Sequence, residues 1–78
     1  MSYNNYQKVT TMGMKYYKLF DLLNRRNITR TKMRLDLGMS TKTLAKISAH
    51  EPLSMEIIEK ICAYLDVQPG DIMEYEKK

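Results

Sequence analysis

The chain has 78 residues, a net charge of +4 and a hydrophobic fraction of 44%, which together support one small folded domain. Its single cysteine, Cys62, excludes an internal disulfide bond. The sequence contains no apolar run long enough to cross a bilayer and no succession of residues typical of a secretion signal. We therefore expect a soluble, cytoplasmic protein whose stability comes from packing.

Charge is divided unevenly along the chain. Residues 1–48 carry ten Lys or Arg against Asp21 and Asp36, a net of +8. Residues 49–78 carry three Lys against seven Asp or Glu, a net of −4. One basic side is the electrostatic signature of a protein that binds a polyphosphate. Lys and Arg also serve simply to solvate helices, so composition leaves both interpretations open.

The N-terminal segment differs from the rest of the chain. Residues 1–13 lack helical periodicity, and we interpret them, with Tyr3 and Tyr6, as a flexible arm in front of a domain over residues 14–78. The segment MKYYKLFDLLNRR, from residue 14 to residue 26, repeats apolar residues at i, i+3, i+4 and i+7, which predicts an amphipathic helix. Its inward residues are Tyr16, Leu19, Phe20 and Leu23.

Two short helices are predicted next, with a glycine between them. Thr29 is a good N-cap for a helix over residues 30–37. Gly38 ends that helix because glycine adopts the left-handed conformation without a Cβ penalty. Ser40 then caps a helix over residues 41–48, whose first turn faces water. The apolar residues of the two helices are Met33, Leu37, Leu44, Ala45 and Ile47.

The last part of the chain predicts two more helices. Ser54 caps MEIIEKICAYL, residues 55–65, whose apolar positions again follow helical spacing. The segment QPGDIMEY, residues 68–75, is interpreted as a short fifth helix with Pro69 in its first turn and Asp71 reaching back to the cap at Gln68. No strand pattern is found. The expected fold class is therefore all-α, a compact domain of five short helices.

The second and third predicted helices, joined by a tight glycine turn, form a helix-turn-helix, in which the second helix enters the DNA major groove. The segments ITRTKMRLDLGMSTKTLAKI and SMEIIEKICAYLDVQPGDIMEY resemble the phage-repressor-like (lambda repressor and Cro type) helix-turn-helix domains, especially small single-domain bacterial regulators. Arg34 departs from this pattern, because alanine is commonest at its position, and we expect its stem to lie along the surface with its head in water. The positions that match the pattern are Met33, Gly38, Leu44 and Ile47.

The resemblance implies a recognition helix over residues 41–48. The residues implied in base reading are Thr41, Lys42, Thr43 and Lys46. Lysine can donate to guanine O6 and N7, and threonine can contact the methyl group of thymine. Phosphates are expected at the two helix N-termini, where free N–H groups favour anions. The residues expected to contact phosphate are Thr29, Arg30, Thr31 and Ser40, with further charge from Arg25, Arg26 and Lys32. By spacing alone, the same residues form a solvated helix face with ordinary caps.

Other chemistry finds little support in the sequence. His50 is the only histidine and has no metal-ligand spacing to a second ligand, so we interpret it as a surface loop residue. Cys62 lies on the apolar side of its helix and fits a small buried hydrophobe. No nucleophile, base and orienting group can be assembled. We expect no catalysis, no metal, no cofactor and no small-molecule ligand.

The sequence thus predicts a regulator, a repressor in the simpler hypothesis, that binds specific double-stranded DNA as a homodimer on an inverted repeat, in the cytoplasm and on the nucleoid. Two alternatives stay open. One is a protein-interaction module, antitoxin-like or an accessory factor, which the acidic residues 49–78 favour. The other is a non-specific nucleoid protein. Salt dependence and sequence preference of binding separate the three.

Overall fold

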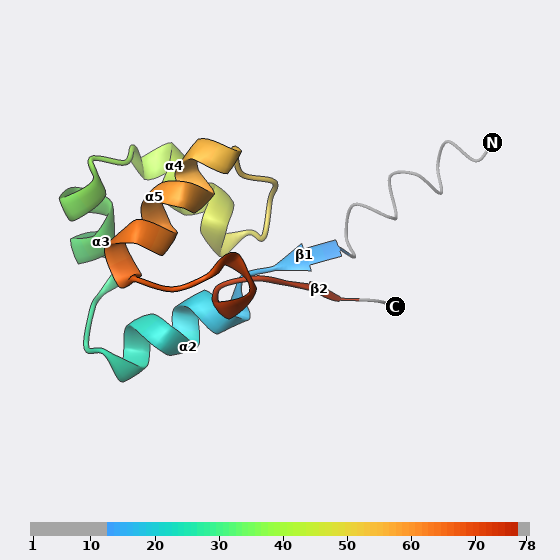
Figure 1. Cartoon of the computed structure of the whole chain (residues 1–78). Coiled ribbons are helices and arrows are strands. Elements are labelled where there is room, and N and C mark those ends of the chain that lie inside the picture. Colours follow the sequence, from blue (N-terminus) through green and yellow to red (C-terminus); the bar gives the residue numbers. More distant parts are fainter. Residues whose placement is uncertain (1–12, 77–78) are drawn as a thin grey trace.

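The structure, a computed structural model, describes residues 13–76. Four α-helices pack together, and a two-stranded ribbon lies at one end of the helical body (Figure 1). In chain order the elements are β1 (Gly13–Lys15), α2 (Tyr17–Arg25), α3 (Arg30–Leu37), α4 (Thr41–Ser48), α5 (Met55–Leu65), the 3-10 turn η1 (Pro69–Asp71) and β2 (Glu74–Glu76). The predicted arm, including Tyr3 and Tyr6, lies outside the described residues except for Gly13, which begins β1.

One hydrophobic core joins all four helices. Its buried residues are Tyr16, Leu19, Leu23, Met33, Met39, Ile47, Ile58, Ile61, Leu65 and Ile72. The inward faces predicted for the helices are confirmed at most positions, although Phe20, Leu37, Leu44 and Cys62 are only half-buried and Ala45 is exposed. Because each helix is short, its stability depends on this shared core more than on its own backbone hydrogen bonds.

The N-termini of α3, α4 and α5 are capped as the sequence predicts. The hydroxyl of Thr29 accepts a hydrogen bond from the Lys32 N–H at 3.0 Å. Ser40 caps α4 and Ser54 caps α5 in the same way, at 3.0 Å and 3.2 Å. Each cap satisfies one of the backbone donors that a helix start leaves without a partner, which is worth about 1 kcal/mol.

The four helices also end in the same way. The sequence predicts this kind of ending for only one of them, the helix that ends at Gly38. A residue with a left-handed backbone follows the last turn of each helix: Asn27, Gly38, His50 and Asp66, with φ of 59°, 67°, 59° and 58°. The next N–H then donates to a carbonyl five residues back: Ile28 to Leu23, Met39 to Arg34, Glu51 to Lys46 and Val67 to Cys62. This is the Schellman arrangement, which satisfies the last carbonyls of a helix. Gly38 is the only glycine among the four.

The left-handed backbone at Gly38 makes a mutational prediction. We expect Gly38→Ala to lower the free energy of unfolding by about 1 kcal/mol, because a Cβ is strained at φ of 67° even though no other group lies within 4 Å of it. Gly38→Asn serves as the control, since asparagine tolerates this conformation better. Urea denaturation followed by circular dichroism measures both. Equal stability of Gly38→Ala and the wild type would show that this turn does not depend on glycine.

Two predictions about the ends of the fold are wrong. The first helix begins at Tyr17 and not at Met14, because Gly13–Lys15 forms β1, and the predicted fifth helix is only the 3-10 turn η1 followed by β2. The two strands pair antiparallel, with Met14 opposite Tyr75. The described residues therefore hold four α-helices and one small sheet, in place of the expected five helices.

Short length and distant pairing explain these differences. A helix of eight residues is marginal without strong packing, and the pairing partner of residues 74–76 is β1, at the other end of the chain. Lys15 on β1 lies 3.9 Å from the Glu76 carboxylate on β2, so opposite charges support the strand pairing. Lys18 on α2 lies 3.6 Å from the Glu74 carboxylate and joins α2 to β2. The predicted cap is confirmed, because the Asp71 carboxylate accepts a hydrogen bond from the Gln68 N–H at 2.9 Å.

Candidate nucleic-acid interface

The turn between α3 and α4 holds the two helices in a fixed relation. Met39, directly after Gly38, is buried with 6% of its surface exposed, and thereby anchors the turn in the core. Arg34 Nη1 donates a hydrogen bond to the Met39 carbonyl at 3.2 Å. The expectation that the Arg34 head lies in water is therefore wrong. The side chain spans the turn and satisfies a carbonyl of the turn itself, outside both helices.

The first turn of α4 is exposed, as the sequence predicts. Thr41, Lys42 and Lys46 are exposed, and Thr43 is half-buried with its hydroxyl 3.1 Å from that of Ser40. Lys42 and Lys46 are four residues apart and so lie on the same side of the helix. Within residues 13–76 neither lysine has an ion pair or a side-chain hydrogen bond. Both ammonium groups are therefore available to an external partner.

The helix starts expected to bind phosphate are partly occupied by their own caps. The hydroxyls of Thr29 and Ser40 each accept a hydrogen bond from the backbone of their helix. Thr31, in the first turn of α3, is exposed. The earliest N–H groups of both helices lie outside the caps' reach, because a single cap satisfies only one donor. These N–H groups and the positive end of the helix dipole are favourable for an anion.

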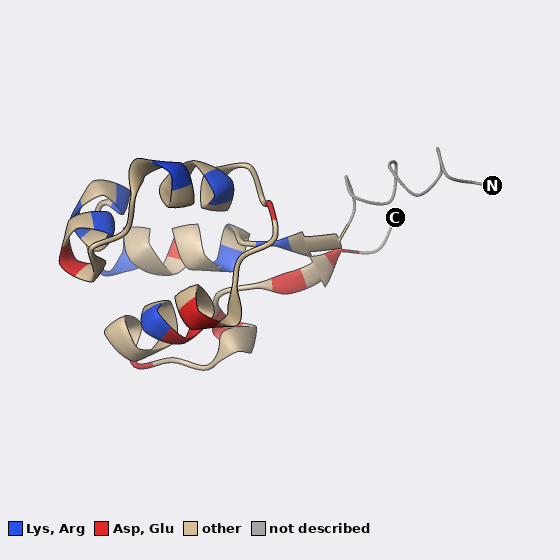
Figure 2. Ribbon diagram, turned by 90° about the horizontal axis from the view of Figure 1, so that it is seen from above, with Lys and Arg blue, Asp and Glu red and all other residues tan. Residues whose placement is uncertain are grey.

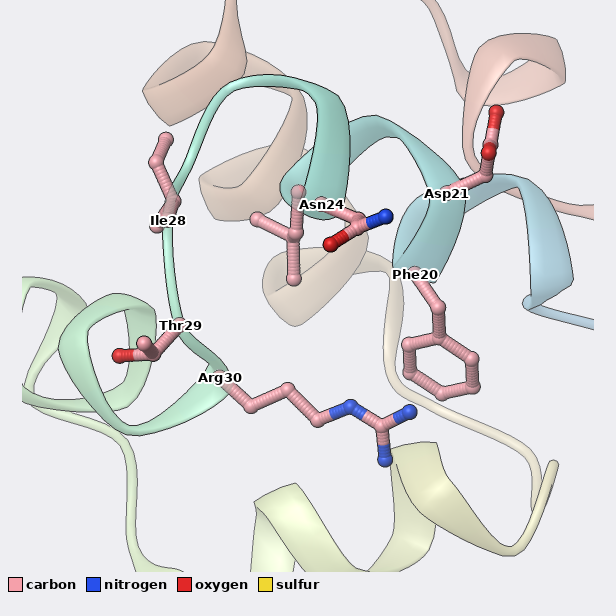
Figure 3. A pocket seen from close by; sticks show the side chains of 7 residues that line it. Phe20, Asp21, Asn24, Ile28, Thr29 and Arg30 are labelled. Atoms are coloured by element: carbon pink, nitrogen blue, oxygen red, sulfur yellow. The ribbon is translucent and has the colours of Figure 1, made fainter.

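Arg30 links three helices. Its guanidinium lies 3.8 Å from the centre of the Phe20 ring on α2, and its Nη1 donates to the Ser48 hydroxyl at the end of α4 at 3.1 Å. Figure 3 shows the side chain extending from the start of α3 toward that ring, along the edge of a pocket. The pocket is lined by Phe20, Asp21, Leu23, Asn24, Ile28, Thr29 and Arg30. Arg30 thus fixes both ends of the helix-turn-helix relative to α2.

The other three predicted phosphate contacts have partners within the chain. Arg25 Nε lies 3.0 Å from the Asp21 carboxylate, and Lys32 Nζ lies 3.1 Å from that of Asp36. Both pairs are exposed, so each is worth at most about 1 kcal/mol and can be exchanged for a phosphate. Arg26 is different, because its Nη1 donates to the Leu65 carbonyl at 2.6 Å and so caps the end of α5.

Charge follows the helices. Figure 2 shows Lys and Arg on α3 and α4 along one side of the molecule, and Asp and Glu concentrated on α5 and the segment after it, along the opposite side. The division seen in the sequence is therefore preserved in space. The basic side coincides with the exposed face of α4.

His50 is a structural residue that the sequence analysis missed. It is half-buried, and its Nδ1 accepts a hydrogen bond from the Tyr16 N–H at 3.0 Å. Its ring centre lies 4.5 Å from that of Tyr17 and 5.9 Å from those of Tyr16 and Phe20. The interpretation of His50 as a simple surface loop residue is therefore wrong. No local signal marks it, because its hydrogen-bond partner is 34 residues away.

The environment of His50 favours its neutral form. Burial lowers the pKa of the imidazole, the positive charges of Lys15 and Arg30 lower it further, and the Glu76 carboxylate opposes them. The neutral form is also the one that the hydrogen bond requires, because a protonated Nδ1 cannot accept from the Tyr16 N–H. Nearby, the Tyr16 hydroxyl donates to the Glu51 carbonyl at 2.7 Å, which ties the same loop to the start of α2.

The pKa values of Cys62 and Asp36 are also shifted. Burial raises the pKa of the Cys62 thiol, which keeps it protonated and weakly reactive. A 2.6 Å hydrogen bond from Tyr64, and then the nearby Lys32, lower the pKa of the Asp36 carboxyl.

In the described part of the chain, no three His, Cys, Asp or Glu side chains come together to bind a metal ion. None of its helices is long and apolar enough to span a membrane.

The acidic side carries an apolar groove along α5. Met55 is 74% exposed, and the groove continues past Cys62 to Pro69. Its lining residues are Met55, Ile58, Glu59, Cys62, Ala63, Asp66, Val67, Gln68 and Pro69. The negative charges on this side would repel the phosphates of DNA.

Comparison with known proteins agrees with this geometry. The sequence model described as "Cro/C1-type HTH DNA-binding domain" matches residues 11–78. A similar solved structure is the crystal structure of the transcriptional regulator VanUg, form II, with 34% sequence identity and a TM-score of 0.82. The similarity covers 87% of this chain and 91% of that one. No curated protein matches the sequence significantly.

Proposed function

The chain belongs to the Cro/C1-type helix-turn-helix DNA-binding domains, and on this basis we propose that it is a transcriptional regulator that reads a specific double-stranded DNA sequence with α4 in the major groove. The family is one of DNA-binding domains and not an enzyme class. The similarity to a transcriptional regulator over most of both chains supports the same role.

The observation that carries the proposal is that Lys42 and Lys46 are exposed and have no charged partner among the described residues. Both are exposed on one side of α4, and among the described residues neither is neutralised by a partner. Lysine donors at such positions can reach guanine O6 and N7, and Thr41 beside them adds a hydroxyl and a methyl group. Thr43 is the weakest candidate of the predicted four, since its hydroxyl is held by Ser40.

Phosphate contacts in this proposal come from the starts of α3 and α4. Thr29, Thr31 and Ser40 would contribute backbone or hydroxyl donors, and Arg30 would contribute charge. Arg25 and Lys32 can join by giving up their exposed carboxylate partners. Arg26 contributes only long-range charge as long as it caps α5.

We further propose that the protein binds as a homodimer to an inverted repeat and acts as a repressor. A single module of this size offers few base contacts, and two half-sites on one face of the duplex multiply the specificity. Blocking the access of polymerase needs no further machinery. Among the described surfaces, the end of α5 with its apolar groove is available for such a dimer.

The decisive experiment selects from a pool of random duplexes near physiological salt and sequences what is retained. Enrichment of an inverted repeat supports a sequence-specific dimer, whereas a single half-site supports specific binding by a monomer. Retention without any motif would replace this proposal with non-specific nucleoid binding.

Salt dependence provides a second, quantitative prediction. If about six phosphates are neutralised, the logarithm of the association constant should fall with the logarithm of salt concentration with a slope of about −5. Fluorescence anisotropy of a labelled operator at several salt concentrations measures this slope. A slope near zero would contradict binding through the basic side.

A second candidate function is protein binding through the groove on α5. The exposed Met55 and the apolar lining favour it, because such patches mark interaction sites. This function would show no preferred duplex and no dependence on Lys42 or Lys46. Failure of the duplex selection would therefore direct attention to this groove.

A further inference from the structure

His50 has two structural roles, one for its backbone and one for its side chain. It is the left-handed residue that ends α4, with φ of 59°, and the N–H groups of His50 and Glu51 donate back to the Ile47 and Lys46 carbonyls. Its imidazole Nδ1 is also the acceptor for the Tyr16 N–H, one residue before α2 begins. The His50 side chain therefore connects the end of the candidate recognition helix to the start of α2, beside the hydrogen bond from the Tyr16 hydroxyl to the Glu51 carbonyl.

The surroundings of this imidazole disfavour a positive charge. Lys15 on β1 and Arg30 on α3 are cationic, and Glu76 on β2 supplies an opposing negative charge. The aromatic side chains of Tyr17 and Phe20 on α2, and of Tyr16 just before it, face the ring. Phe20 already holds the Arg30 guanidinium 3.8 Å from its ring centre, so it offers little cation–π stabilisation to a second cation.

We propose that neutral His50 is a positioning residue for the DNA-binding face, and that its protonation weakens DNA binding by loosening the attachment of the end of α4 to the start of α2. This inference rests on the proposed function. Protonated Nδ1 is a donor, so it would oppose the Tyr16 N–H at 3.0 Å and the two groups must separate. In this proposal His50 itself does not contact DNA.

The path from His50 to the DNA-binding face is short. Ser48, two residues earlier, accepts the hydrogen bond from Arg30, and Arg30 begins α3. Displacement of the loop at His50 therefore disturbs the contact that fixes the end of α4 relative to the start of α3. The start of α3, proposed to bind phosphate, and α4, proposed to read bases, would then no longer be held in a fixed relative position. Both sets of contacts depend on that relative position.

The test compares operator affinity from about pH 7.5 down to the lowest pH at which the protein stays folded, because the surroundings of His50, the only histidine of the chain, lower the pKa of its imidazole. For the wild type we expect affinity to fall about fivefold toward acid, which is the usual worth of one lost hydrogen bond. His50→Asn should keep the wild-type affinity within about threefold and lose the pH dependence, because its amide oxygen can accept at the position of Nδ1 and asparagine tolerates a left-handed backbone.

A second variant separates the imidazole from the backbone turn. His50→Gly keeps the left-handed conformation but removes the acceptor, so we expect about fivefold weaker binding at every pH, close to that of protonated wild type. Circular dichroism at each pH defines the range in which the protein is folded. Within that range, the midpoint of the affinity change must coincide with the titration of the His50 ring observed by NMR.

The outcomes are distinct. Wild-type binding that is strong and independent of pH overturns this inference and leaves the proposed function intact. Affinity that rises toward acid also overturns it, since protonation of His50 would then not weaken binding. Wild-type protein that binds no duplex at any pH overturns the proposed function. Persistence of the pH dependence in His50→Asn would assign it to another group and reject the role of His50.

Discussion

Replacing Lys42 or Lys46 by alanine is expected to weaken binding to the selected operator by roughly 10- to 100-fold without changing the fold. Both side chains are exposed and have no ion pair or side-chain hydrogen bond among residues 13–76, so their removal leaves the described intramolecular contacts in place. If these lysines read bases, the loss on the operator exceeds the loss on a shuffled duplex of the same length. Fluorescence anisotropy with both duplexes measures the two affinities.

Lys60→Ala is the matched control. Lys60 is also an exposed lysine in the middle of a helix, but it lies on α5, on the acidic side of the molecule. We expect its removal to change affinity by no more than about twofold, in keeping with long-range screened electrostatics. Equal losses for Lys42→Ala, Lys46→Ala and Lys60→Ala would show that total charge, and not the face of α4, determines binding.

Replacing Ile47 by alanine is expected to lower the free energy of unfolding by about 2–5 kcal/mol. Ile47 is 0% exposed and lies in the core on the inner side of α4, so alanine removes buried methyl groups and leaves a cavity. Small domains have a total stability of about 5–15 kcal/mol, so this loss is a large part of the whole. Urea denaturation followed by circular dichroism measures the change.

The control for this prediction is Leu35→Ala on α3. Leu35 is 62% exposed, and its truncation should change the free energy of unfolding by no more than about 0.5 kcal/mol. A large effect at Leu35 together with a small one at Ile47 would contradict the assignment of the inner and outer helix faces. The comparison also shows whether loss of DNA binding in core variants comes simply from unfolding.

The features predicted from the sequence are those created by neighbouring residues. The caps at Thr29 and Ser40 form within three residues, and the glycine turn at Gly38 depends on the backbone freedom of a single residue. The exposed start of α4 also follows from local spacing, because its apolar residues come late in the helix. Most of the helix-turn-helix and the exposed lysine pair could therefore be predicted.

The features that were missed involve residues far apart in the chain. His50 and Tyr16 are 34 residues apart, and Arg26 and the Leu65 carbonyl are 39 residues apart. Three residues such as Gly13–Lys15 are too few to show the alternation of a strand, so their pairing is visible only when the partner is known. The left-handed backbone at His50 also has no glycine to indicate it.

The small sheet has a consequence for how the protein is made. β1 lies at the beginning of the described chain and β2 at its end, with Gly13 opposite Glu76. During synthesis the four helices can emerge and begin to pack while β1 still lacks its partner. Pairing requires the closure of almost the whole described chain, and such non-local contacts form slowly. The strand pairing next to the His50 loop is therefore completed only after translation has passed residue 76.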